Sequence, residues 1–96
     1  MLMIVIRRLI WDSWNVAHIA RHEVTPDEVE EVCHGEYIVR QTYDERLLLI
    51  GPALNGRMLV VILGPTKKRG VYYPVTARSA SKKERNLYKT NIGEST

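Results

Sequence analysis

The chain has 96 residues, 45% hydrophobic and 26% charged, so it is long enough for one compact domain, too short for two, and too apolar for wholesale disorder. Its single cysteine excludes an internal disulfide and a four-cysteine zinc site, and it is compatible with a reducing cytoplasm. The formal net charge of +3 is uneven: residues 1–56 hold five Lys and Arg against nine Asp and Glu, and residues 57–96 hold nine against two.

An opening strand and a first helix are predicted at the N-terminus. Residues Met1–Trp11 are rich in Leu, Ile and Val, which is typical of a strand. Arginines interrupt this segment, which is also too short for a secretory signal or for a membrane helix of about 18–20 apolar residues. Asp12 or Ser13 can cap a helix that extends to about His22. Its apolar stripe is spaced i, i+3, i+4 and consists of Val16, Ile19 and Ala20.

The second helix has the clearest start signal in the chain. Thr25 and Glu28 form a capping box, and Pro26 lies between them at the first helical position. Gly35 predicts the end of this helix. The residues expected to be buried are Val29, Val32 and Cys33.

Four further strands are predicted, at Tyr37–Thr42, Arg46–Ile50, Met58–Leu63 and Val71–Ala77. The two middle strands carry continuous apolar runs, which indicates central strands covered on both faces. Asn55 and Gly56 between them predict a tight hairpin with positive φ at both residues. Pro74 cannot donate to a strand ladder, so the last strand is either an edge or bulged at that point.

A last helix begins at Ser81, where Ser81 and Glu84 form a second capping box. Residues 91–96 are expected to be a loose tail after a single domain over residues 1–90. The predicted order is β-α-α-β-β-β-β-α. It indicates an α+β fold in which helices pack on an antiparallel sheet of four to five strands.

Three segments of this sequence resemble the BrnT toxins over about residues 10–89. The first consists of Trp11-Asp12, Asn15, His18 and Arg21-His22. The middle one consists of Glu45-Arg46, Ile50-Gly51, Gly56-Arg57 and Leu59-Val60-Val61. The last consists of Thr76-Ala77-Arg78, Ala80, Glu84-Arg85 and Tyr88. The chain departs from the family at Glu23, where Gly is usual, at Tyr73, where Arg is usual, and in a Trp-to-His spacing that is one residue shorter.

The resemblance implies a cytoplasmic ribonuclease toxin of a type II toxin–antitoxin pair, with a fold similar to the RelE toxins. It implies cleavage of RNA without metal or cofactor, no membrane partner, and silencing by an antitoxin of ribbon-helix-helix type. A homodimer or a heterotetramer with that antitoxin is compatible with such a pair. The departures leave open a catalytically silent protein- or RNA-binding module on the same scaffold, or a DNA-contacting subunit of a repressor complex.

Metal-free cleavage needs an acid, a base and cations beside the 2′-hydroxyl of the substrate. His22 is a candidate acid or base, unless it only caps the first helix. Arg78 is a candidate phosphate ligand, unless it bonds nearby carbonyls. Glu45 beside Arg46 is a candidate base, unless the two form a cross-strand charge pair. We expect His22 and Arg78 to converge in one cationic hollow.

The histidines are otherwise expected to be structural. His18 and His22 share a helix face, but a third ligand and the Glu of an H-E-x-x-H motif are missing, so no metal site is predicted. His34 is expected to cap the second helix.

Basic side chains with one tyrosine are the candidate nucleic-acid contacts. They are Arg21, Lys82, Lys83, Arg85, Tyr88 and Lys89. On the last helix they form either a phosphate-tracking stripe or a solvated face. The tyrosine either stacks on a base or packs on the sheet, and packing is favoured. The basic loop Lys67–Gly70 either touches phosphates or faces solvent.

Overall fold

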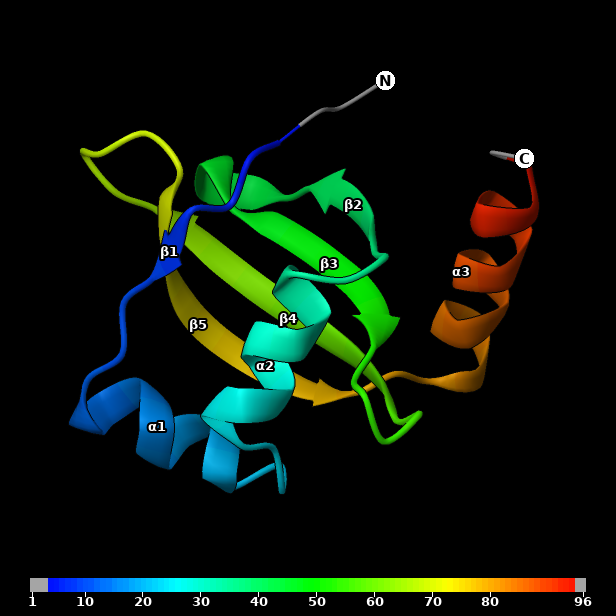
Figure 1. Ribbon diagram of the computed structural model, residues 1–96, viewed down its shortest axis with the longest axis horizontal. Coiled ribbons are helices and arrows are strands. Elements are labelled where there is room, and N and C mark those ends of the chain that lie inside the picture. The colour runs from blue at the N-terminus through cyan, green and yellow to red at the C-terminus, as the bar shows by residue number, and fades with distance from the viewer. Residues whose placement is uncertain (1–3, 95–96) are drawn as a thin grey trace.

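The computed structural model describes residues 4–94, with side chains for residues 4–92 (Figure 1). Its strands are β1 (Arg8–Leu9), β2 (Ile38–Gln41), β3 (Leu47–Pro52), β4 (Met58–Pro65) and β5 (Val71–Ser79). Its helices are α1 (Ser13–Ala20), α2 (Pro26–Cys33) and α3 (Lys82–Glu94), with a short 3-10 turn, η1 (Tyr43–Glu45). The strands form one sheet in the order β1-β5-β4-β3-β2. None of the helices in the described part of the chain is long and apolar enough to cross a membrane.

The predicted α+β class and element order are confirmed, with one correction to the sheet. Because β1 pairs with β5 in parallel while the other neighbours are antiparallel, the sheet is mixed. The first strand is also far shorter than Met1–Trp11, since only Arg8 and Leu9 pair with the start of β5. Beyond that pairing the chain turns away into α1, and residues 1–3 lie outside the described residues.

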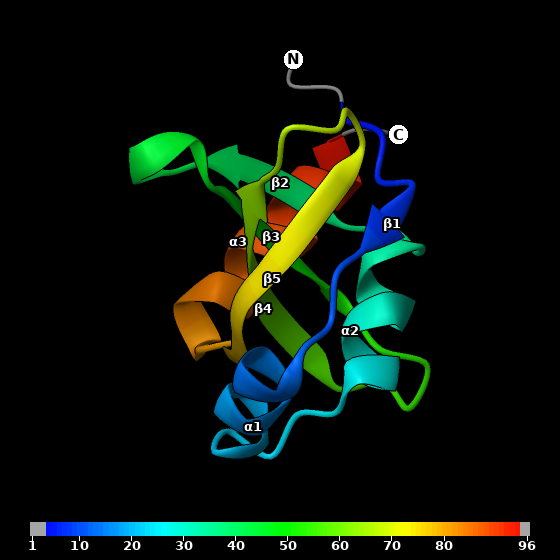
Figure 2. The same ribbon diagram turned by 90° about the vertical axis from the view of Figure 1, so that its left-hand side faces the viewer.

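The two faces of the sheet are covered by different helices, as Figure 2 shows for α2 and α3. One face packs under α1 and α2, with Ile19, Val29, Leu49 and Val61 in its core. The other face packs under α3 and includes Val60, Ile50 and Tyr88. The continuous apolar runs of β3 and β4 follow from this, because successive side chains of each strand enter different cores.

The predicted α2 is confirmed in detail, whereas α1 differs in its buried face. Thr25 and Glu28 form the capping box of α2, and His34 is its C-cap residue. The α1 helix is capped by Asp12, but its buried residues are Asn15 and Ile19, while Val16 and Ala20 are exposed. A single turn of α1 faces the core, so an i, i+4 pair is enough to dock it.

Two successive left-handed residues were predicted at the β3–β4 hairpin, but they lie in the β2–β3 hairpin. At the β3–β4 hairpin only Gly56 has positive φ (88°), so the expectation for Asn55 is wrong. At the β2–β3 hairpin, Asp44 and Glu45 have φ of 59° and 61°, and the Arg46 N–H donates to the carbonyl before them. Two successive left-handed residues are the mark of a type I′ turn, here built without glycine.

The predicted bulge at Pro74 and the capping box at Ser81 are confirmed, and the predicted loose C-terminal tail is corrected. The pairing of β4 with β5 steps from Ile62–Thr76 to Leu63–Pro74, so β5 is bulged beside the proline and is not an edge there. The capping box of Ser81 and Glu84 is present. The expected tail over 91–96 is helical through Glu94, and residues 95–96 lie outside the described residues.

Candidate nucleic-acid interface

The outer side of α1 carries a row of rings, exposed at Trp14 and His22 and half-buried at His18. The Trp14 and His18 rings are stacked, with centroids 4.8 Å apart and planes 8° apart. His18 then meets His22 edge-on at 5.9 Å. Trp14 is 57% exposed, and beside it a hollow of about 430 Å³ reaches Arg21. An exposed aromatic face next to a cation is suited to stacking on an unpaired nucleic-acid base.

A buried asparagine fixes α1 against the sheet. Asn15 is fully buried, and its amide NH2 donates to the carbonyls of Ile10 (2.9 Å) and Pro74 (3.1 Å). Its amide oxygen accepts from the Asp12 N–H, and Asp12 in turn accepts from the Asn15 N–H. The carbonyl freed by the irregular pairing beside Pro74 is therefore used to position α1.

Tyr73 completes this arrangement. Its hydroxyl donates to the carboxylate of Asp12 at 2.9–3.0 Å. The Asn15 N–H and this hydroxyl hold the pKa of Asp12 below its usual value. A half-buried tyrosine thus orders the start of α1 through the carboxylate that caps it.

The turn that holds His22 is fastened by an arginine that the sequence reasoning did not single out. The Arg57 guanidinium donates to the His22 carbonyl at 3.2 Å, to the Glu23 carbonyl and to the Ser79 hydroxyl at 2.9 Å. It also lies 3.5 Å from the carboxylate of Glu28. Arg57 therefore ties the end of α1 to the end of β5. Its place in the matched Gly56-Arg57 motif was the signal that could have found it.

Arg78 lies on the opposite face of the sheet from α1. It pairs with Val60, whose side chain is in the core under α3. Its guanidinium makes two hydrogen bonds with Glu84, at 2.7 and 2.8 Å, and these lower the pKa of Glu84 to about 2. Arg57 bonds both the His22 carbonyl and the hydroxyl of Ser79, the residue next to Arg78. The expected shared hollow is wrong, because the Arg78 side chain lies on the face of α3 and the hollow beside Trp14 does not include it.

Glu45 and Arg46 lie at the other end of the sheet. Both are exposed, and Glu45 is the second left-handed residue of the β2–β3 turn. Arg78 pairs with Val60 on β4, and Val60 pairs with Ile50 on β3, so Arg78 and Ile50 lie at the same height in the sheet. Arg46 is four residues before Ile50, which corresponds to about 13 Å along the strand. The structure therefore separates this pair from both His22 and Arg78.

The candidates on α3 divide into an exposed set and a buried tyrosine. The exposed ones are Lys82, Lys83, Arg85 and Lys89. Tyr88 is only 9% exposed, and its hydroxyl donates to the Glu36 carbonyl at 3.0 Å. Burial raises the pKa of this phenol. The prediction that Tyr88 packs on the sheet is confirmed, and its assignment to nucleic-acid binding is wrong because its ring is enclosed.

The His18–His22 pair is not joined by a third metal ligand from the described part of the chain. Among the described residues 4–94, no group of three or more His, Cys, Asp or Glu side chains could hold a metal ion. Cleavage without metal stays a prediction.

The Arg78–Glu84 pair predicts an acid-sensitive stability. A carboxyl whose folded pKa is depressed stabilises the fold above its unfolded pKa of about 4.5, and this contribution is lost as pH falls from about 5 to about 2. We expect Glu84→Gln to lower the free energy of unfolding at pH 7 by about 1–2 kcal/mol, since the pair is partly solvated. Urea unfolding between pH 2 and 7 should show a flatter dependence for the variant. Parallel curves would contradict this role.

Glu23 predicts a gain in stability on substitution by glycine. Its φ of 59° is a left-handed conformation that costs a residue with a Cβ about 1–2 kcal/mol. We expect Glu23→Gly to raise the free energy of unfolding by about 0.5–1 kcal/mol, because glycine adopts this φ without that cost. Glu23→Ala removes the same carboxylate but keeps the Cβ, so it serves as the control. An equal gain in both variants would assign the effect to charge instead of backbone conformation.

Comparisons with known proteins give one informative match. No family model matches the chain, and no curated protein matches it. Among solved structures, it is similar to the ribonuclease toxin BrnT of Brucella abortus, with a TM-score of 0.63 and 27% sequence identity. The match covers 78% of this chain and 97% of that one.

Proposed function

We propose, from the premise that this chain has a BrnT-like fold, that it is the toxin of a type II toxin–antitoxin pair and cleaves RNA without a metal. The match to a ribonuclease toxin supports a toxin family and carries the proposal. The row of Trp14, His18 and His22 supports RNA as the substrate, because it offers both a stacking surface and titratable groups.

In the proposed reaction the substrate supplies its own nucleophile. His22 accepts the proton of a 2′-hydroxyl, the 2′-oxygen bonds to phosphorus, and the bond from phosphorus to the 5′-oxygen breaks. The departing 5′-oxygen takes a proton from a second group, for which His18 is the neighbouring titratable side chain. The products are a 2′,3′-cyclic phosphate and a 5′-hydroxyl. We assign to Arg21, which lines the hollow with Trp14 and His18, the role of balancing the charge that develops on the phosphate.

Arg78 has a different place in this proposal from the one its sequence position suggested. Its charge is balanced by Glu84, so it contacts a phosphate only when that carboxylate yields it. Glu45 and Arg46 are too far along the sheet to take part at His22. The exposed cations of α3 are proposed to contact flanking RNA.

The cellular setting belongs to the same proposal. We assign the chain to the cytoplasm, with RNA as substrate and a ribbon-helix-helix antitoxin as the partner that silences it, in a homodimer or in a heterotetramer with that antitoxin. The similarity to a toxin supports this context in general. A short neighbouring reading frame with a ribbon-helix-helix pattern would support the pairing.

The test of the activity uses the purified full chain without any partner. Incubated with total RNA, it is expected to give fragments that end in cyclic phosphate, at the same rate with and without a chelator. Absence of cleavage, together with harmless expression in cells, would overturn the proposal. Cleavage abolished by the chelator would overturn the metal-free mechanism.

One observation favours a second candidate, a binding module without catalysis. Two positions that could offer a cation to a substrate have no free positive charge. The charge of Arg78 is paired with Glu84, and position 73 is a tyrosine that donates to Asp12. Such a module would bind RNA and leave it intact. Product analysis of the same incubation separates the two candidates.

A further inference from the structure

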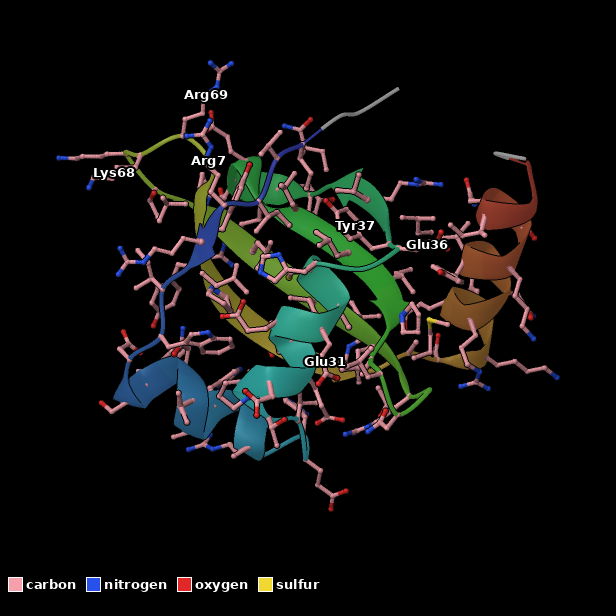
Figure 3. All side chains as sticks on the ribbon, viewed as in Figure 1. Arg7, Glu31, Glu36, Tyr37, Lys68 and Arg69 are labelled. Carbon is pink, nitrogen blue, oxygen red and sulfur yellow. The ribbon has the colours of Figure 1, made fainter. Side chains whose placement is uncertain are left out.

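Five cations gather at the end of the sheet that is remote from His22. They are Arg7, Arg8, Lys67, Lys68 and Arg69, which we call the basic end. Two come from β1 and the residue before it, and three from the loop between β4 and β5. Figure 3 shows Arg7, Lys68 and Arg69 together at this loop, with Lys68 and Arg69 pointing outward.

The loop of the basic end is ordered by its own hydrogen bonds. The Thr66 hydroxyl donates to the Val71 carbonyl at 2.7 Å and accepts from the Lys68 N–H at 3.2 Å. The Val71 N–H donates back to the Lys68 carbonyl. The loop therefore presents its cations from a defined backbone, which lowers the entropy cost of binding a ligand.

A glycine brings β1 onto this loop. Gly70 has a φ of 80°, and its carbonyl accepts from the N–H groups of Arg7 and Arg8 at 2.7 and 3.2 Å. A Cβ at this position would lie 2.9 Å from Cγ of Arg7, so only glycine lets the Arg7 stem lie against the loop. Arg7 and Arg69 then line a hollow of about 340 Å³ together with Tyr72.

Within residues 4–92, whose side chains the structure describes, no carboxylate forms an ion pair with a cation of the basic end. Among the side chains that the structure describes, the carboxylates in ion pairs are Glu28, Glu30 and Glu84, and none of these lies at the basic end. Neighbouring unpaired cations repel one another and attract a polyanion. Guanidinium groups in particular fit phosphate oxygens through two parallel hydrogen bonds.

The basic end and the turn of His22 lie at the two ends of one strand. β5 begins at the loop of the basic end and runs nine residues to Ser79, which Arg57 ties to the turn of His22, so this turn lies about 26 Å along the strand from the loop. Figure 2 shows the loop above and α1 below on the same side of the molecule, joined by the segment that follows β1. A single-stranded RNA long enough to span this side reaches both surfaces, whereas a dinucleotide does not.

We infer that the basic end is a second RNA site, which binds the phosphate backbone of a single strand whose cleaved linkage lies at α1. This inference rests on the proposed function and adds a minimum substrate length to it. An acidic protein segment would be attracted by the same charges, but a guanidinium-lined hollow on the same side as the exposed rings favours RNA.

The test measures binding of the full chain to a labelled RNA of about 16 nucleotides by fluorescence anisotropy at several salt concentrations. Each lost phosphate contact lowers the slope of log K against log salt by about 0.7, which is about fivefold in affinity at 0.1 M salt. We expect this change for Arg69→Gln and about 25-fold for the double variant K68Q/R69Q. The matched control is Arg40→Gln, an exposed arginine of β2 outside both surfaces.

The outcomes separate this inference from the proposed function. Equal losses in Arg69→Gln and Arg40→Gln, or binding of poly-glutamate as tight as that of RNA, would overturn the basic end as an RNA site. So would equal cleavage losses by K68Q/R69Q on a dinucleotide and on the long RNA. If the slopes change as expected but no variant cleaves RNA, the basic end stands and the proposed catalysis fails. If the wild type cleaves and the slopes do not change, the reverse holds.

Discussion

Replacing Asn15 by leucine is expected to lower the free energy of unfolding by about 3–4 kcal/mol, and we expect no single exposed substitution to cost as much. The reason is the number of backbone groups that lose a partner. Asn15 satisfies the Asp12 N–H and the carbonyls of Ile10 and Pro74, and it is fully buried. Leucine has a similar size, so the loss comes from unpaired polar groups and not from a cavity. Urea unfolding at neutral pH measures it.

The control for this prediction is an asparagine whose hydrogen bonds are open to solvent. Asn91 donates to the Leu87 carbonyl and accepts from the Arg40 guanidinium, and water can replace both bonds. We expect Asn91→Leu to change the free energy of unfolding by no more than about 0.5 kcal/mol. A loss of less than about 1 kcal/mol for Asn15→Leu would show that water or a shifted backbone satisfies the groups that Asn15 bonds.

Replacing His22 by glutamine is expected to reduce kcat/KM for RNA cleavage by about 10²–10⁴-fold, the usual contribution of a general acid or base. Because the side chain is exposed, the free energy of unfolding should change by no more than about 0.5 kcal/mol. Glutamine keeps a polar side chain but cannot exchange a proton near neutral pH. Initial rates in the presence of a chelator, measured across pH, test this.

The matched control is His34→Gln, the exposed histidine that caps α2 beside Glu30. It should cleave at the wild-type rate. Full activity of His22→Gln would remove His22 from the mechanism, and an equal loss in both variants would point to a general effect of removing a histidine. Loss of the pH dependence in His22→Gln alone would support its proton-transfer role.

Features that depend on a few consecutive residues were predictable from the sequence. The capping boxes at Thr25 and Ser81 each need two side chains three positions apart, and both are present. The turn at Gly56 was placed correctly, but its type was not, because the twist of the flanking strands decides which residues become left-handed. The length of β1 depended on its pairing with a strand 63 residues later, which no local pattern encodes.

The candidate site was harder to predict because its partners come from distant elements. Arg78 and Glu84 were both visible as motif residues, but their pairing depends on α3 folding back beside the end of β5. Arg57 was visible in the same way, and its contacts with Glu23 and Ser79 appear only once two hairpins and a helix are in place. The sequence predicted that His18 and His22 share one face, and their rings do meet edge-on, although α1 ends at Ala20. It did not predict that Trp14 stacks on His18.

The position of β2 at the border of the sheet has a consequence for self-association. In the described part of the chain its outer side has no strand beside it, and an open row of peptide groups is a template on which further chains can polymerise. This row is only four residues long, Ile38–Gln41, and it carries an exposed arginine at its third position. Shortness and charge are the means by which natural sheets discourage fibre growth, so the chain is suited to remain dispersed at high concentration.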